Sequence, residues 1–92
     1  MIINNTFNLS IEDPFGKDDQ YVFNLKNCMY MARNTPKCLR FVFGTHNLVI
    51  HFTTLEAVEK YFTVFMDYFE GKVSSVEIED SDLENCELEV KE

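Results

Sequence analysis

The clearest structural signal in this chain is residues 53–71, TTLEAVEKYFTVFMDYFEG. Thr53 and Glu56 match a capping box, in which each side chain can satisfy a backbone N–H of the first helical turn. Gly71 suits the position just after a helix. Between them, apolar residues recur at spacings of three and four and form one stripe, made of Leu55, Val58, Phe62, Phe65 and Phe69. The segment predicts a helix over residues 54–70 whose aromatic face packs on a sheet.

Apolar and polar residues alternate in several segments on both sides of this helix, as is typical of strands with one buried face. These segments are residues 3–11, 21–26, 39–43, 48–52, 73–78 and 86–90. The middle two predict a hairpin across residues 44–47, with Val42 and Val49 on a second, partly covered face. Residues 26–34 fit either a strand or a helical turn. The order of elements predicts an α+β fold, in which a small antiparallel sheet of about 5–6 strands carries the helix on one face.

The length of 92 residues predicts one compact domain over residues 1–92, with an acidic C-terminal strand or tail over residues 80–92. The first residues do not resemble a signal peptide, and no apolar run reaches the roughly twenty residues that span a bilayer. The three cysteines are widely spaced and include no CxxC pair, which favours a reducing compartment. A soluble cytoplasmic protein is therefore expected.

Charge is segregated along the chain, whose net charge is -8. Residues 77–92, EIEDSDLENCELEVKE, contain eight of the sixteen acids and one lysine. No acid lies between Asp19 and Glu56, where the sequence instead has Lys26, Arg33, Lys37 and Arg40. A net negative field repels phosphate, so direct DNA binding is not expected. The four cations either balance the acidic strands within the fold or contact an RNA backbone.

No catalytic or cofactor motif accompanies these charges. The sequence lacks GxGxxG, GxxxxGK[ST], HExxH and GxSxG. Cys38 and His51 can be adjacent across the predicted hairpin, which leaves a small thiol-dependent enzyme or sensor as an alternative. The cysteines and histidines lack the paired spacing of a zinc site, and the acidic run lacks the glycine of an EF-hand. We therefore expect no enzyme activity, no metal and no cofactor.

The acidic segment has two explanations that remain open. Charged residues on an outer strand prevent one sheet from pairing with another. Alternatively, carboxylates at every second strand position repeat at roughly 6–7 Å, close to the phosphate spacing of a nucleic-acid strand. Glu77 with Glu79, and Glu87 with Glu89, have this spacing in the sequence. Such a display would fit the basic groove of a nucleic-acid-handling protein.

In size, acidity and predicted fold, the chain resembles the small phage-encoded anti-defence proteins, of which anti-CRISPR inhibitors are the best-known group. It is also similar to the immunity proteins that neutralise nuclease toxins. The resemblance rests on the acidic positions from Glu77 to Glu92 and on the aromatic residues around the helix, and it involves no family motif. It implies stoichiometric occlusion of a Lys/Arg-lined channel in a CRISPR effector complex or nuclease, with Tyr61, Tyr68 or Phe15 as surface anchors.

The residues expected to bind this protein partner are Glu77, Glu79, Asp80, Asp82, Glu84, Glu87, Glu89, Tyr61 and Tyr68. The alternative is a homodimeric structural or interaction module, joined through the last strand or through surplus apolar residues of the helix. An inhibitor, whether a monomer or a homodimer with its acidic face free, is expected to lose binding when acidic residues are reversed to lysine. A structural dimer is expected to fail instead at Tyr61 or Tyr68.

Overall fold

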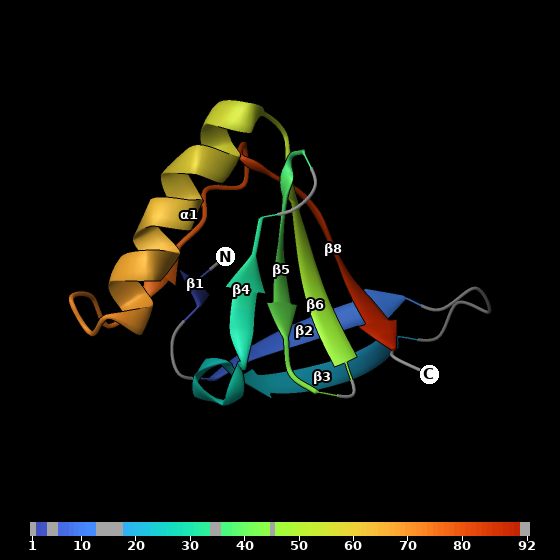
Figure 1. Ribbon diagram of the computed structural model, residues 1–92. Coiled ribbons are helices and arrows are strands. Elements are labelled where there is room, and N and C mark those ends of the chain that lie inside the picture. The colour runs from blue at the N-terminus through green and yellow to red at the C-terminus, as the bar shows by residue number, and fades with distance from the viewer. Residues whose placement is uncertain (1, 4–5, 13–17, 34–35, 45, 91–92) are drawn as a thin grey trace.

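A computed structural model describes residues 2–3, 6–12, 18–33, 36–44 and 46–90. Four strands form an antiparallel sheet in the order β4 (Tyr30–Ala32), β5 (Cys38–Val42), β6 (His46–Phe52) and β8 (Leu83–Val90). Two antiparallel ribbons accompany the sheet, β1 (Ile2–Ile3) with β7 (Val76–Glu77) and β2 (Thr6–Glu12) with β3 (Asp18–Asn24). One α-helix, α1 (Leu55–Phe69), lies on one side of the four-stranded sheet (Figure 1). The predicted α+β fold is confirmed.

The N-terminal end of α1 lies one residue later than the capping box predicts. Thr54 is the N-cap, because its backbone is extended and its side-chain oxygen accepts a hydrogen bond from the Ala57 N–H at 3.1 Å. The hydroxyl of Thr53 instead donates to the carbonyl of Ser81. Thr53 therefore ties the helix start to the turn before β8, and Thr54 takes the capping role.

The C-terminal end of α1 is closed as predicted. Gly71 has a φ of +81°, which a glycine adopts without the steric cost that a Cβ imposes. Its N–H donates to the carbonyl of Tyr68, and the N–H of Lys72 donates to the carbonyl of Asp67. These two bonds form a Schellman motif with Gly71 at C′.

The buried face of α1 is rotated from the predicted stripe. Its buried residues are Ala57, Val58, Tyr61, Phe65 and Tyr68. Leu55 and Phe69, the two ends of the predicted stripe, are 53% and 42% exposed. Both stripes have helical spacing, so hydropathy alone does not choose between them. The structure favours the stripe with Tyr61 because the hydroxyl of this residue finds hydrogen-bond partners inside the fold.

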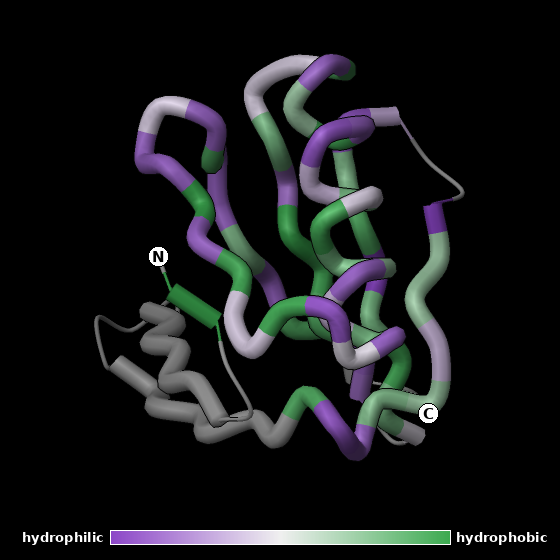
Figure 2. The backbone as a smooth tube through the Cα atoms, turned by 90° about the vertical axis from the view of Figure 1, so that its left-hand side faces the viewer, coloured by the Kyte–Doolittle hydropathy of each residue, from purple (hydrophilic) through white to green (hydrophobic). Residues whose placement is uncertain are grey.

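The core lies between α1 and the four-stranded sheet. The ring of Phe65 meets that of Phe41 edge to face at 4.8 Å, and Tyr61 stacks on Phe52 at 5.3 Å. Ile3 of β1 and Val76 of β7 belong to the same buried cluster. In Figure 2, hydrophobic residues (green) dominate where the strands and the helix meet, and hydrophilic residues (purple) occupy several outer turns.

The predicted central hairpin is confirmed as β5 and β6. The residue after Phe43, Gly44, has a φ of +95° in the turn, and the Phe43 N–H donates to the carbonyl of His46 at 2.9 Å. Val42 and Val49 are buried, with exposed fractions of 2% and 0%. Since both point to the sheet face opposite the helix, the second face is covered there, as predicted.

The structure also fixes the conformation of residues 26–33 and the start of the last strand. Within residues 26–34, the chain ends a 3-10 turn, η1 (Leu25–Asn27), and then forms β4. The last strand, β8, begins at Leu83 rather than at residue 86, because Leu83 already pairs with Phe52. The register shifts by one residue beside this pair and leaves Glu84 without an opposite residue on β6. Residue 15, the predicted anchor in the first loop, and residues 91–92 lie outside the described part of the chain.

Candidate functional site

The acidic residues of the C-terminal segment divide into two groups. Glu77, Glu79, Asp80 and Glu84 are exposed along the end of β7, the following turn and the start of β8. We call these four the acidic surface. Glu79 follows the end of β7, so Glu77 and Glu79 do not have the regular strand spacing that the sequence predicts for them. Of the two predicted pairs, Glu87 and Glu89 have that spacing, on β8.

Glu87 and Glu89 are hydrogen-bonded within the sheet. Arg40 of β5 donates to both carboxylate oxygens of Glu89, from Nε at 2.8 Å and from Nη2 at 3.3 Å. Asn47 of β6 also donates to Glu89, at 3.5 Å. His51 Nε2 lies 2.8 Å from an oxygen of Glu87. The sequence assigns these two glutamates to partner binding, but Arg40 already compensates charge on Glu89, and one oxygen of Glu87 already contacts His51.

The Arg40–Glu89 pair predicts a specific pH dependence of stability. The hydrogen bond from Arg40 is the main cause that holds the pKa of Glu89 below its usual value. A carboxyl with a lowered folded-state pKa stabilises the fold above its unfolded pKa and loses this contribution as pH falls through the folded one. The variant Glu89→Gln is therefore expected to be less stable than wild type at pH 7, with the difference vanishing at an acidic pH below the folded-state pKa of Glu89.

Urea denaturation at the two pH values measures this effect. The Glu89 side chain is 40% exposed, so solvent screening limits the difference to at most about 1 kcal/mol. Glu84→Gln, at an exposed site on the same strand, is the matched control and should show no such pH-dependent difference. A constant deficit of Glu89→Gln at both pH values would mean that charge on Glu89 is not the cause.

Tyr61 links the helix to the turn that bears the acidic surface. Its hydroxyl donates to Asp82 Oδ2 at 2.8 Å and accepts a hydrogen bond from the Glu79 N–H at 3.1 Å. Burial raises the pKa of the Tyr61 hydroxyl, so it remains protonated and able to donate at neutral pH. Lys60 Nζ lies 3.8 Å from the same Asp82 oxygen. The turn is thereby held in one position against α1.

This arrangement bears on three of the expected binding residues. Tyr61 and Tyr68 are only 1% and 7% exposed, so neither is a surface anchor. The carboxylate of Asp82 accepts a hydrogen bond from the Tyr61 hydroxyl, so it does not face solvent alone. Sequence reasoning missed the bridging role of Tyr61, although a tyrosine in the middle of an apolar helix face is itself a signal that its hydroxyl needs a partner.

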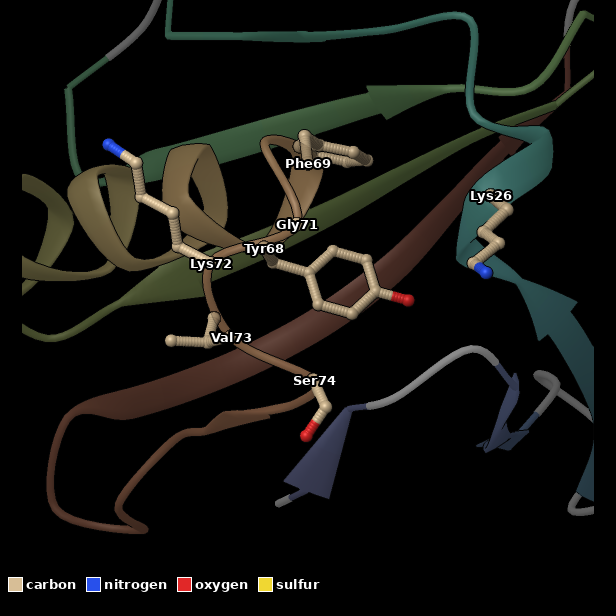
Figure 3. Close-up of a pocket in the computed structure, with 7 residues that line it drawn as sticks. All are labelled: Lys26, Tyr68, Phe69, Gly71, Lys72, Val73 and Ser74. Atoms are coloured by element: carbon tan, nitrogen blue, oxygen red, sulfur yellow. The ribbon is translucent and has the colours of Figure 1, made fainter.

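A pocket of about 710 Å³ lies at the C-terminal end of α1, between this helix and η1. Figure 3 shows the hydroxyl of Tyr68 and the amine of Lys26 directed toward the same space, while Lys72 points away. Lys72 forms an ion pair with Glu70 at 2.9 Å. No acidic side chain is among the described residues that line this pocket, so it is separate from the acidic surface.

The four cations of the central segment lie on different elements. Lys26 is in η1, Arg33 follows β4, Lys37 precedes β5, and Arg40 is within β5. Arg33 lies 3.6 Å from Glu59 of α1, and Arg40 binds Glu89. The Arg40 contact agrees with the prediction that the cations balance the acidic strands within the fold, whereas Arg33 pairs with the helix instead. An RNA contact through the four residues stays a prediction.

The thiol and metal chemistry is limited in the described part of the chain. The register places Cys38 opposite His51, as predicted, but Cys38 is buried and His51 is engaged with Glu87. Burial raises the pKa of Cys86 to about 11, which disfavours the nucleophilic thiolate. Among the residues that the structure describes, no group of three or more His, Cys, Asp or Glu side chains is arranged to hold a metal ion.

None of the described helices has both the length and the apolar character needed to cross a membrane. Comparison with known proteins adds no relative: no family model matches the chain, and no curated protein or solved structure matches it.

Proposed function

We propose that this protein binds a basic surface of another protein through its acidic surface, and that it thereby blocks a nucleic-acid-handling protein by stoichiometric occlusion. The observation that carries this proposal is the double hydrogen bond of Tyr61 to Asp82 and to the Glu79 N–H. It fixes the backbone of the acidic turn before any partner arrives. Binding through a preorganised surface costs less conformational entropy than binding through a flexible tail.

The negative charge of this protein supports a partner with a basic surface. The net charge of -8 and the exposed carboxylates of the acidic surface attract a Lys/Arg-lined groove and accelerate encounter with it. A groove of this kind is what proteins that handle nucleic acids offer to phosphate. A CRISPR effector complex is the target that the resemblance to anti-CRISPR inhibitors implies, acting in the cytoplasm of a host cell. A nuclease toxin is the target that the resemblance to immunity proteins implies.

The test is a comparison of two charge-reversed variants in a pull-down from bacterial lysate that contains CRISPR effectors and nucleases. Glu79→Lys with Asp80→Lys is expected to weaken capture of a stoichiometric partner by about tenfold or more. Glu59→Lys with Glu70→Lys changes the net charge equally, at an exposed position of α1 and at its exposed C-cap, and should leave capture nearly intact. The captured partner should elute as salt rises and should lose its nucleic-acid binding when this protein is added.

Two results would contradict the proposal. Absence of any stoichiometric partner at low salt is one of them. An equal loss of capture in both variants is the other, since it would assign binding to net charge rather than to the acidic surface.

A homodimeric module is the second candidate, and a different observation favours it. Met66 and Phe69, on adjacent turns of α1, are each 42% exposed, and Val73 beyond the helix is 39% exposed. Exposed large apolar side chains of this kind are common where two protein surfaces meet. A dimer in sedimentation that Phe69→Lys converts to a monomer would support this candidate.

A further inference from the structure

The strand β8 forms one edge of the four-stranded sheet. It pairs with β6 on one side, and no described residue pairs with its other side. The unpaired N–H and C=O groups of a sheet edge are a template for another strand. The irregularity at Glu84 leaves residues 85–90 as the regular part of this edge. The opposite edge, β4, has only three residues and offers a much shorter template.

We propose that the outer edge of β8 binds an extended segment of the protein partner by β-strand addition, and that this segment alternates basic with apolar residues. This inference rests on the proposed function, because it names the part of the partner that binds next to the acidic surface. Main-chain hydrogen bonds supply affinity in strand addition, and alternate side chains supply specificity.

One face of β8 selects basic residues. Glu87 and Glu89 point to the sheet face opposite α1, where their hydrogen bonds run inward to β6 and β5. Their side chains remain 51% and 40% exposed, and the second oxygen of Glu87 has no partner among the described residues. A lysine or arginine on an added strand would therefore lie beside Glu87 as a cross-strand pair of opposite charge, whereas both oxygens of Glu89 already accept hydrogen bonds from Arg40.

The other face of β8 selects apolar residues. Cys86 and Leu88 point toward the helix side, because they pair with the buried residues Ile50 and Leu48 of β6. Both are only partly buried at the edge. Apolar side chains on an added strand would extend the core over them. The two faces together define the alternation of the partner segment.

The same charges disfavour a second copy of this chain as the occupant. Antiparallel pairing of two β8 strands about a two-fold axis at Leu88 would place Glu87 of one copy opposite Glu89 of the other. Like charges that are directly opposite across strands destabilise the pair. The acidic edge therefore opposes self-association and admits a basic strand.

The test uses three short peptides with blocked ends and the intact protein. In the first, lysine alternates with valine; the second is identical but carries N-methyl groups on every second backbone nitrogen; the third has glutamate in place of lysine. The first peptide is expected to bind about tenfold or more tightly than the second, because only the first can complete the main-chain hydrogen bonds. The third is expected not to bind.

Amide hydrogen exchange provides the structural readout. Binding of the first peptide should slow exchange of the outward-facing N–H groups between Asn85 and Glu89 by about tenfold, because these become hydrogen-bonded. Equal binding of the first two peptides would overturn strand addition but leave the proposed function intact, since the acidic surface would still attract cations. No binding of the first peptide at low salt would overturn this inference, whereas capture of a partner from lysate decides the proposed function independently. Binding of the third peptide would overturn the selection by charge.

Discussion

Replacement of Phe65 by alanine is expected to lower the free energy of unfolding by about 3–5 kcal/mol, the largest effect of any single change considered for this protein. Phe65 is 0% exposed and its ring meets that of Phe41 edge to face, at 4.8 Å and 64°. Truncation removes this contact and leaves a cavity between α1 and β5. Urea denaturation followed by circular dichroism measures the loss.

Phe69→Ala is the matched control, because it removes the same side chain from the same helix one turn later. Phe69 is 42% exposed, and its loss is expected to cost less than about 1 kcal/mol. If Phe65→Ala proves too unstable to refold, Phe65→Leu retains much of the volume and should lie between the control and wild type. Equal losses at positions 65 and 69 would contradict the observed orientation of α1 and favour the stripe that periodicity predicts.

Tyr61→Phe is expected to lower the free energy of unfolding by about 1–3 kcal/mol and to loosen the acidic turn. The substitution keeps the ring stacked on Phe52 but removes the hydroxyl that bridges Asp82 and the Glu79 N–H. Both groups then lose a partner close to the core. Because the hydroxyl fixes the turn, partner binding through the acidic surface should weaken although no acidic residue has changed.

Hydrogen exchange at the Glu79 amide tests this effect directly, and exchange in Tyr61→Phe is expected to be faster than in wild type. Tyr68→Phe is the matched control, since Tyr68 is also a buried tyrosine of α1 but lies near the pocket at the other end of the helix. Its substitution should leave the Glu79 amide unchanged. An unchanged Glu79 amide in Tyr61→Phe would show that other contacts hold the turn, such as the bond from the Thr53 N–H to the Asp82 carbonyl.

The structure changes how the acidic C-terminal segment is expected to recognise a partner. Among the described residues of this segment, carboxylates at strand spacing occur at Glu87 and Glu89, and both already contact cationic or titratable residues of neighbouring strands. Two residues of the acidic surface, Glu79 and Asp80, lie instead at a turn that a buried tyrosine holds against the helix, between Glu77 of β7 and Glu84 of β8. Recognition of a basic partner is therefore proposed to depend on a shaped turn and an adjacent strand edge, rather than on imitation of phosphate spacing.

Local features of this protein were predictable from the sequence by itself. The helix over residues 55–69, its end at Gly71 and the β5–β6 hairpin follow from periodicity and from residues that favour particular backbone angles. These signals act between residues that are near in the chain, so they need no knowledge of the rest of the fold. The same signals predicted the α+β class and the acidic C-terminal strand.

Only the tertiary structure decided which side chains are buried and which charges are compensated. Tyr61 replaces Phe69 on the buried face because Asp82 and Glu79, about twenty residues later, supply partners for its hydroxyl. Glu89 pairs with Arg40, 49 residues away, because β6 brings β5 and β8 to its two sides. A periodicity pattern treats every tyrosine or glutamate alike. The free energy of burying such a side chain, however, depends on the groups that the fold places next to it.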